Sequence, residues 1–153
     1  MARTLITEVS DTIPHPIEEV WSLASAFGSI KSWMPSIESC VVDGKDIGAI
    51  RTVITHGSSI PVKEQLAIWD HDHYTISYRL LDPIPLPMRG GFGTVSLKSL
   101  DSGTTKVTWR SDAEDVSEEG IRDVGPIFAV FIKDCLTELK QVLGRPARAA
   151  ASS

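Results

Sequence analysis

Between residues 37 and 112 the sequence alternates strand-like runs with short turns, and this pattern limits the possible folds more than any other feature. The turns at 43–46, 57–59, 70–72 and 101–103 are rich in Asp, Gly and Ser, which is typical of short hairpin connections. Hairpins join neighbouring antiparallel strands, so the pattern predicts an antiparallel meander. The predicted strands are 37–43, 48–56, 60–70, 73–82, 91–100 and 105–112.

The segments on either side of this meander complete the predicted order. Residues 4–13 alternate apolar and polar side chains and predict a first strand. Two short helices are predicted next, one from Pro16 up to Gly28 and one at 30–34, because proline and glycine bracket them. A long amphipathic helix is predicted at 121–143. Its apolar stripe consists of Val124, Phe128, Phe131, Cys135 and Leu139.

One long helix after a strongly bent sheet suggests that the sheet wraps the helix. We therefore predict an α+β fold in which a curved seven-stranded antiparallel sheet wraps around the C-terminal helix, with two short helices after the first strand. Such a wrap leaves a cavity between the sheet and the helix. The chain length fits a single domain, predicted at 1–144, and a flexible C-terminal tail is predicted at 145–153.

Composition and charge narrow the function classes. The formal net charge of -5 gives no sign of a basic surface, so no nucleic-acid partner is expected. No apolar run approaches the length of a membrane span, and a soluble, cytoplasmic protein without a membrane partner is expected. Cys40 and Cys135 are far apart and lack metal-ligand spacing, so we expect buried free thiols and no metal. No cofactor is expected either.

Glu64 is the most informative residue for function. Side chains of a strand alternate between its two faces, so Val62, Glu64, Leu66 and Ile68 are expected on the apolar, inner face. A carboxylate there is costly unless it is paired, protonated or open to a wet cavity, and each of these can adapt it to acid or base catalysis. The alternative is a structural ion pair with a neighbouring arginine.

Several short motifs occur in a characteristic order along the chain. They are Ile13-Pro14-His15-Pro16-Ile17-Glu18-Glu19-Val20-Trp21, Ser32-Trp33-Met34-Pro35, Ile47-Gly48-Ala49-Ile50-Arg51, Glu64-Gln65-Leu66, Ile76-Ser77-Tyr78-Arg79 and Val107-Thr108-Trp109. On this pattern of elements the sequence resembles the START/Bet v 1-like (SRPBCC) superfamily, and within it the polyketide cyclase/dehydratase family. The resemblance implies a helix-grip fold and an internal cavity for a hydrophobic ligand. It does not decide function, because the superfamily includes enzymes, receptors and lipid carriers.

Strand alternation and the pattern of the family together predict the lining of this cavity. Trp33 is expected either to cap it or to lie in the core. Met88 ends a proline-rich segment (83–88) expected to form a lid, and His56 is placed at the mouth. The lining is mostly apolar, as is usual for a small-molecule site. The other predicted lining residues are Arg51, Val53, Thr55, Glu64, Leu66, Tyr74, Ile76, Tyr78, Trp109, Ser111, Phe128, Phe131 and Cys135.

The resemblance implies a cofactor-independent cyclase or dehydratase-like enzyme acting on a polyketide-like or other small oxygenated hydrophobic molecule. In that interpretation Glu64 is the general acid or base, with His56 as a second proton carrier. Arg51 pairs with Glu64 or polarises a carbonyl, and Tyr78 donates a hydrogen bond to an enolate. The alternatives are a non-catalytic carrier or sensor of such a molecule, and a subunit that binds a partner protein. We expect a monomer or a homodimer.

Overall fold

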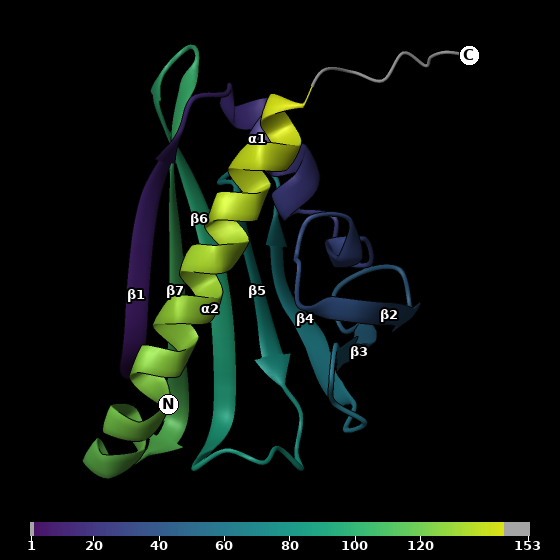
Figure 1. The fold of residues 1–153 in the computed structure, drawn as a ribbon, viewed down its shortest axis with the longest axis vertical. Coiled ribbons are helices and arrows are strands. Elements are labelled where there is room, and N and C mark those ends of the chain that lie inside the picture. The colour runs from purple at the N-terminus through teal and green to yellow at the C-terminus, as the bar shows by residue number, and fades with distance from the viewer. Residues whose placement is uncertain (1, 146–153) are drawn as a thin grey trace.

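The computed structural model describes residues 2–145 and contains every strand and helix that the sequence predicts (Figure 1). Residues 146–153 of the predicted flexible tail lie outside the described residues. The elements are β1 (Thr4–Ile13), α1 (Ile17–Ala24), η1 (Ile30–Ser32), β2 (Ile37–Asp43), β3 (Ile50–Thr55), β4 (Val62–Asp70), β5 (Thr75–Leu80), β6 (Met88–Asp101), β7 (Thr104–Val116) and α2 (Glu118–Gly144).

The strands form one seven-stranded antiparallel sheet in the order β1-β7-β6-β5-β4-β3-β2. Figure 1 shows α2 lying across one face of this sheet, with α1 near the C-terminal end of α2. The helix packs mainly on β1 and β7. The predicted α+β fold, a curved sheet around a long C-terminal helix, is thus confirmed.

Most elements end within a few residues of their predicted bounds. The largest differences are in β6 and β7, which extend to Met88 and Val116 because these two ends pair with each other. The long helix also starts earlier than predicted, at Glu118. Ser117 precedes it, and its side-chain oxygen accepts a hydrogen bond from the main-chain N–H of Gly120 at 3.0 Å, which caps the helix.

The prediction that Ile68 shares the inner face with Glu64 and Leu66 is wrong. The register between β4 and β5 shifts between Leu66 and Ile68, so the strand carries one extra residue there. Beyond this bulge the two faces exchange. Ile68 is 44% exposed, whereas the indole of Trp69 turns inward and donates to the main-chain oxygen of Ser25 at 2.9 Å.

The apolar core has two parts. The larger joins α1, η1 and the C-terminal half of α2 to the inner face of the sheet, with Val20, Trp33, Trp109 and Leu136 among its members. The smaller consists of the buried Ile6, Met88, Ala113 and Val124. No helix in residues 2–145 is long and apolar enough to cross a membrane. Nor does this range hold a group of three or more His, Cys, Asp and Glu side chains placed to hold a metal ion.

Candidate functional site

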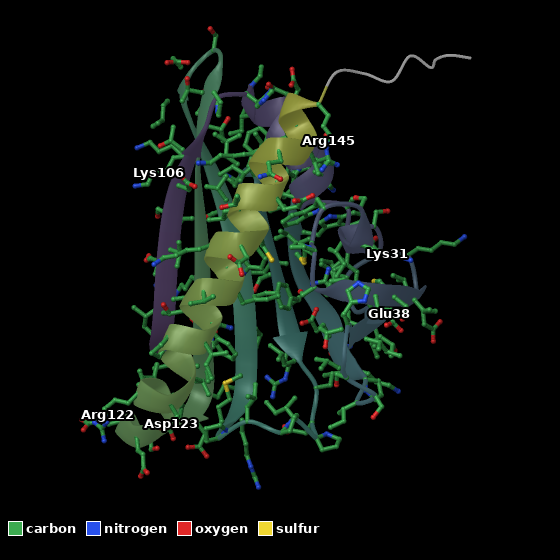
Figure 2. The ribbon with its side chains drawn as sticks, viewed as in Figure 1. Lys31, Glu38, Lys106, Arg122, Asp123 and Arg145 are labelled. Atoms are coloured by element: carbon green, nitrogen blue, oxygen red, sulfur yellow. The ribbon has the colours of Figure 1, made fainter. Side chains whose placement is uncertain are left out.

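A cavity of about 260 Å³ lies between α2 and the inner face of the sheet. Its lining is almost entirely apolar, with Glu64, Tyr78 and Ser111 as the main polar side chains. The charged side chains labelled in Figure 2, such as Lys31 and Arg122, point away from the space between the helix and the sheet. The lining residues are Glu64, Tyr78, Leu80, Phe92, Gly93, Trp109, Ser111, Ile127, Phe128, Phe131 and Ile132.

Strand register creates the space for this cavity. Tyr78 on β5 pairs with Gly93 on β6, and Gly93 pairs with Ser111 on β7. A Cβ atom at position 93 would collide with the ring and hydroxyl of Tyr78, so only glycine leaves room for the phenol here. The small side chain of Ser111 lines the cavity beside Gly93, on β7. Together these residues form a floor on which a flat molecule could lie.

Glu64 forms a buried ion pair with Arg51. The two residues are direct partners on β4 and β3, and Arg51 Nε donates to Glu64 Oε1 at 2.7 Å. The side chains are only 4% (Arg51) and 15% (Glu64) exposed. Arg51 Nη1 also donates to the main-chain oxygen of Phe27 at 2.9 Å. The alternative considered for Glu64, an ion pair with an arginine, is therefore present, and Glu64 still borders the cavity.

Two aromatic rings hold the Arg51 guanidinium in place. Its Cζ lies 4.2 Å from the ring centroid of Phe27 and 4.8 Å from that of Tyr78, both within the range of cation–π contacts. The two cation–π contacts and the two hydrogen bonds together fix the orientation of the guanidinium. Arg51 can therefore keep the Glu64 carboxylate oriented towards the cavity.

The Tyr78 phenol keeps its proton. Burial raises the pKa of this phenol well above its ordinary value of 10.0, and the negative charge of Glu64 adds to the increase. The charge of Arg51 and the indole N–H of Trp109 act in the opposite direction but do not cancel it. At physiological pH the group is a hydrogen-bond donor beside a carboxylate acceptor, both on the wall of an apolar cavity.

Six of the predicted site residues border the cavity: Glu64, Tyr78, Trp109, Ser111, Phe128 and Phe131. Arg51, Trp33 and Ile76 lie one layer deeper, around a separate hollow of about 20 Å³. Val53, Leu66 and Cys135 are buried in the larger core and border neither space. The β alternation placed these three on the inner face, where neighbouring side chains cover them.

Four predicted site residues lie away from the cavity. His56 is 62% exposed and lies 3.5 Å from Glu38, because β3 ends at Thr55 and the chain leaves the sheet there. Thr55, at that strand end, does not line the cavity either. Tyr74 precedes β5 in a turn with a φ of 48°, and packs on Trp21. Met88 belongs to the smaller core, because it begins β6 instead of ending a lid.

Five lining residues were missed by sequence reasoning: Leu80, Phe92, Gly93, Ile127 and Ile132. Leu80 could have been found, because it follows Tyr78 by two residues on the same strand. Gly93 carried no signal before its pairing with Tyr78 was known. Ile127 is mostly exposed, so its position at the cavity depends on how α2 crosses the sheet.

Burial also affects the thiol of Cys135, which is free, as is Cys40. Burial, with a smaller contribution from Asp134, raises the pKa of Cys135 from 9.0 to about 12. Because the folded-state pKa is the higher one, the stabilisation is complete below about pH 9 and is lost as the pH rises towards 12.

We therefore expect this thiol to lower the free energy of unfolding by about 1.4 kcal/mol per pH unit above about pH 9. Urea unfolding at a series of pH values measures the effect. In Cys135→Ala the decline with pH should be shallower than in the wild type, whatever its stability at neutral pH. Parallel pH profiles for the two proteins would contradict the assignment.

Comparison with known proteins gives one family and many similar folds. The family model described as "Polyketide cyclase / dehydrase and lipid transport" matches residues 4–144. A search of curated proteins found no match. Among solved structures, a protein from Thermobifida fusca has a TM-score of 0.80 at 23% identity, over 91% of this chain and 93% of that one.

Two further similar structures are of named enzymes. Norcoclaurine synthase from Thalictrum flavum, solved as a point mutant with a transition-state analogue, has a TM-score of 0.75 at 14% identity and covers 93% of this chain and 94% of its own. The Zhui aromatase/cyclase from Streptomyces sp. R1128 has a TM-score of 0.69 at 18% identity and covers 95% and 97%. At these identities the likeness concerns the fold.

Proposed function

Because this chain belongs to the polyketide cyclase/dehydrase and lipid-transport family, we propose that its cavity binds a small apolar, oxygen-bearing molecule and that Glu64 and Tyr78 carry out acid–base chemistry on it. One observation supports this most: a carboxylate and a protonated phenol border the same apolar cavity. The cavity of about 260 Å³ is slightly below the usual range for drug-sized ligands. A compound of about one to three rings suits it.

The proposed chemistry is proton abstraction next to a carbonyl group. Glu64 takes the proton, and the electron pair of the broken C–H bond moves to the carbonyl oxygen as an enolate. The phenol of Tyr78 donates a hydrogen bond to that oxygen. The enolate then either attacks a second carbonyl within the same molecule, which closes a ring and forms an alkoxide, or expels a β-hydroxyl group. Protonated Glu64 returns its proton to that alkoxide, or to the departing hydroxyl, which leaves as water. No cofactor is needed for either step.

The ion pair favours one alternative, a carrier or sensor that does not alter its ligand. Arg51 already satisfies Glu64 Oε1, so the carboxylate could be a structural part of the cavity wall. In a carrier, Glu64 and Tyr78 would only bind the oxygens of the ligand. Both functions need the same cavity, and they differ in whether the bound molecule changes.

Binding itself is tested by filling the cavity from its floor. We expect Ser111→Phe to weaken binding of a naphthalene-sized probe by at least about tenfold, because the new ring occupies the space beside Gly93. Titration of 15N-labelled protein with 2-ethylnaphthalene measures the dissociation constant and maps the affected amides. In the wild type these should include Gly93, Ser111 and Phe131.

Thr108→Phe is the matched control, since it adds the same ring to the same strand on the outer face, where Thr108 bonds Ser10. It should leave binding within about twofold of the wild type. If Ser111→Phe bound the probe as well as Thr108→Phe does, the cavity would not be the binding site.

A further inference from the structure

Trp33, which lines the small inner hollow, has a buried hydrogen-bond donor without a partner. Trp33 is only 3% exposed, and within the described residues its Nε1–H has no acceptor. Two other indoles have partners: Trp21 donates to His71 Nδ1 at 3.0 Å, and Trp69 donates to the main-chain oxygen of Ser25 at 2.9 Å. Leaving a buried N–H unpaired is costly, so an unpaired donor beside a hollow points to an acceptor that occupies it.

The hollow adjoins the main cavity. Tyr78 and Trp109 line both spaces. The Trp109 ring lies 6.1 Å from the Trp33 ring on one side and 6.1 Å from the Phe131 ring on the other. A ligand in the main cavity therefore lies one side chain away from the Trp33 donor.

Size and polarity define what the hollow can take. Its volume of about 20 Å³ is enough for about one oxygen-sized group and too small for a carboxylate, a phosphate or a ring. Apart from Trp33, Tyr78 and Arg51, its lining consists of aliphatic side chains, Met34 and the ring of Trp109. Arg51 already donates from Nε to Glu64 and from Nη1 to Phe27. A single uncharged acceptor therefore fits best.

We propose that the inner hollow is a subsite for one carbonyl oxygen of the ligand, which Trp33 recognises through its indole N–H. The inference rests on the proposed function and specifies its substrate class: a neutral ring compound with a ketone at the buried end. Tyr78, the residue assigned to the enolate oxygen, also lines this hollow. Trp33 is thus a specificity-determining residue that selects ketones over hydrocarbons of the same shape.

The test compares 2-acetylnaphthalene with 2-ethylnaphthalene, which differ in the ketone oxygen. In 15N-labelled wild-type protein, we expect the ketone alone to shift the Trp33 indole N–H signal downfield; Trp33→Phe identifies that signal by its loss. Trp33→Phe should weaken binding of the ketone about threefold to tenfold and leave binding of the hydrocarbon within about twofold. Trp69→Phe, whose indole donates outside the hollow, should not change the ratio between the probes.

The outcomes separate this inference from the proposed function. If both probes shift amides around Ser111 and the Trp33 indole signal does not respond to the ketone, the subsite is refuted while cavity binding stands. If Trp33→Phe weakens the binding of both probes equally, the subsite is likewise refuted while cavity binding stands. If neither probe binds the wild type, both the proposed function and the subsite are refuted. The indole shift is measured on wild-type protein, where triple-resonance spectra of 13C,15N-labelled protein also assign the Trp33 signal, so it decides the matter even if Trp33→Phe does not fold.

Discussion

Arg51→Met is expected to lower the free energy of unfolding by about 3 kcal/mol or more, because it leaves the Glu64 carboxylate buried without its partner. It also removes the hydrogen-bond donor to the Phe27 carbonyl and the contacts of the guanidinium with the rings of Phe27 and Tyr78. Breaking a buried ion pair from one side costs about 3–5 kcal/mol, and the lower end applies because Glu64 borders a cavity that water can reach. Urea unfolding at neutral pH measures the loss.

The double variant Arg51→Met with Glu64→Leu separates the unpaired charge from the loss of packing. Removing both charges should recover most of the stability lost in Arg51→Met, since an apolar pair can replace a buried ion pair at little cost. The variant Arg79→Met is the control for a solvent-accessible pair, with Glu114, and should cost much less stability than Arg51→Met. An Arg51→Met protein that is as stable as Arg79→Met would show that the Arg51–Glu64 pair is not effectively buried.

Glu64→Gln is expected to reduce turnover about 100- to 10,000-fold while changing the dissociation constant of the substrate less than about tenfold. Glutamine keeps an oxygen that can accept from Arg51 Nε, so the fold and the shape of the cavity should persist. It has no carboxylate to take a proton. The measurement is kcat and KM on the compound recovered with the protein.

Glu38→Gln is the matched control, because Glu38 is an exposed carboxylate that pairs with His56 at 3.5 Å. It should leave both constants unchanged. If a chemical change of the ligand is observed and Glu64→Gln retains it within a few-fold, Glu64 is not the proton acceptor. If wild-type protein returns its ligand unchanged, the carrier function replaces the enzyme.

Regular strand pairing explains what could be predicted from the sequence. Alternation placed Glu64, Tyr78 and Ser111 on one face, and the structure brings these three to the same cavity, because their strands pair without interruption there. Alternation failed at Ile68, where a bulge exchanges the faces of β4. A bulge depends on the partner strand and leaves no local pattern in the sequence.

Other features depend on contacts between distant segments. The exposure of His56 follows from where the chain leaves the sheet, which the alternation of β3 does not specify. The unpaired indole of Trp33 depends on how η1 meets the sheet and the C-terminal half of α2. Sequence reasoning placed Trp33 near the cavity, but it could not reveal that its N–H lacks an acceptor. Such properties arise only when the core is assembled.

The most direct test of the binding cavity is native mass spectrometry of the wild-type protein and of Ser111→Phe, each produced in the cells from which the protein comes. The wild type should carry one neutral, apolar molecule that contains at least one carbonyl oxygen, and Ser111→Phe should carry none, because its new ring fills the space beside Gly93. If the wild type carried no such molecule, or if both proteins carried the same one equally, the cavity would not be the site of function.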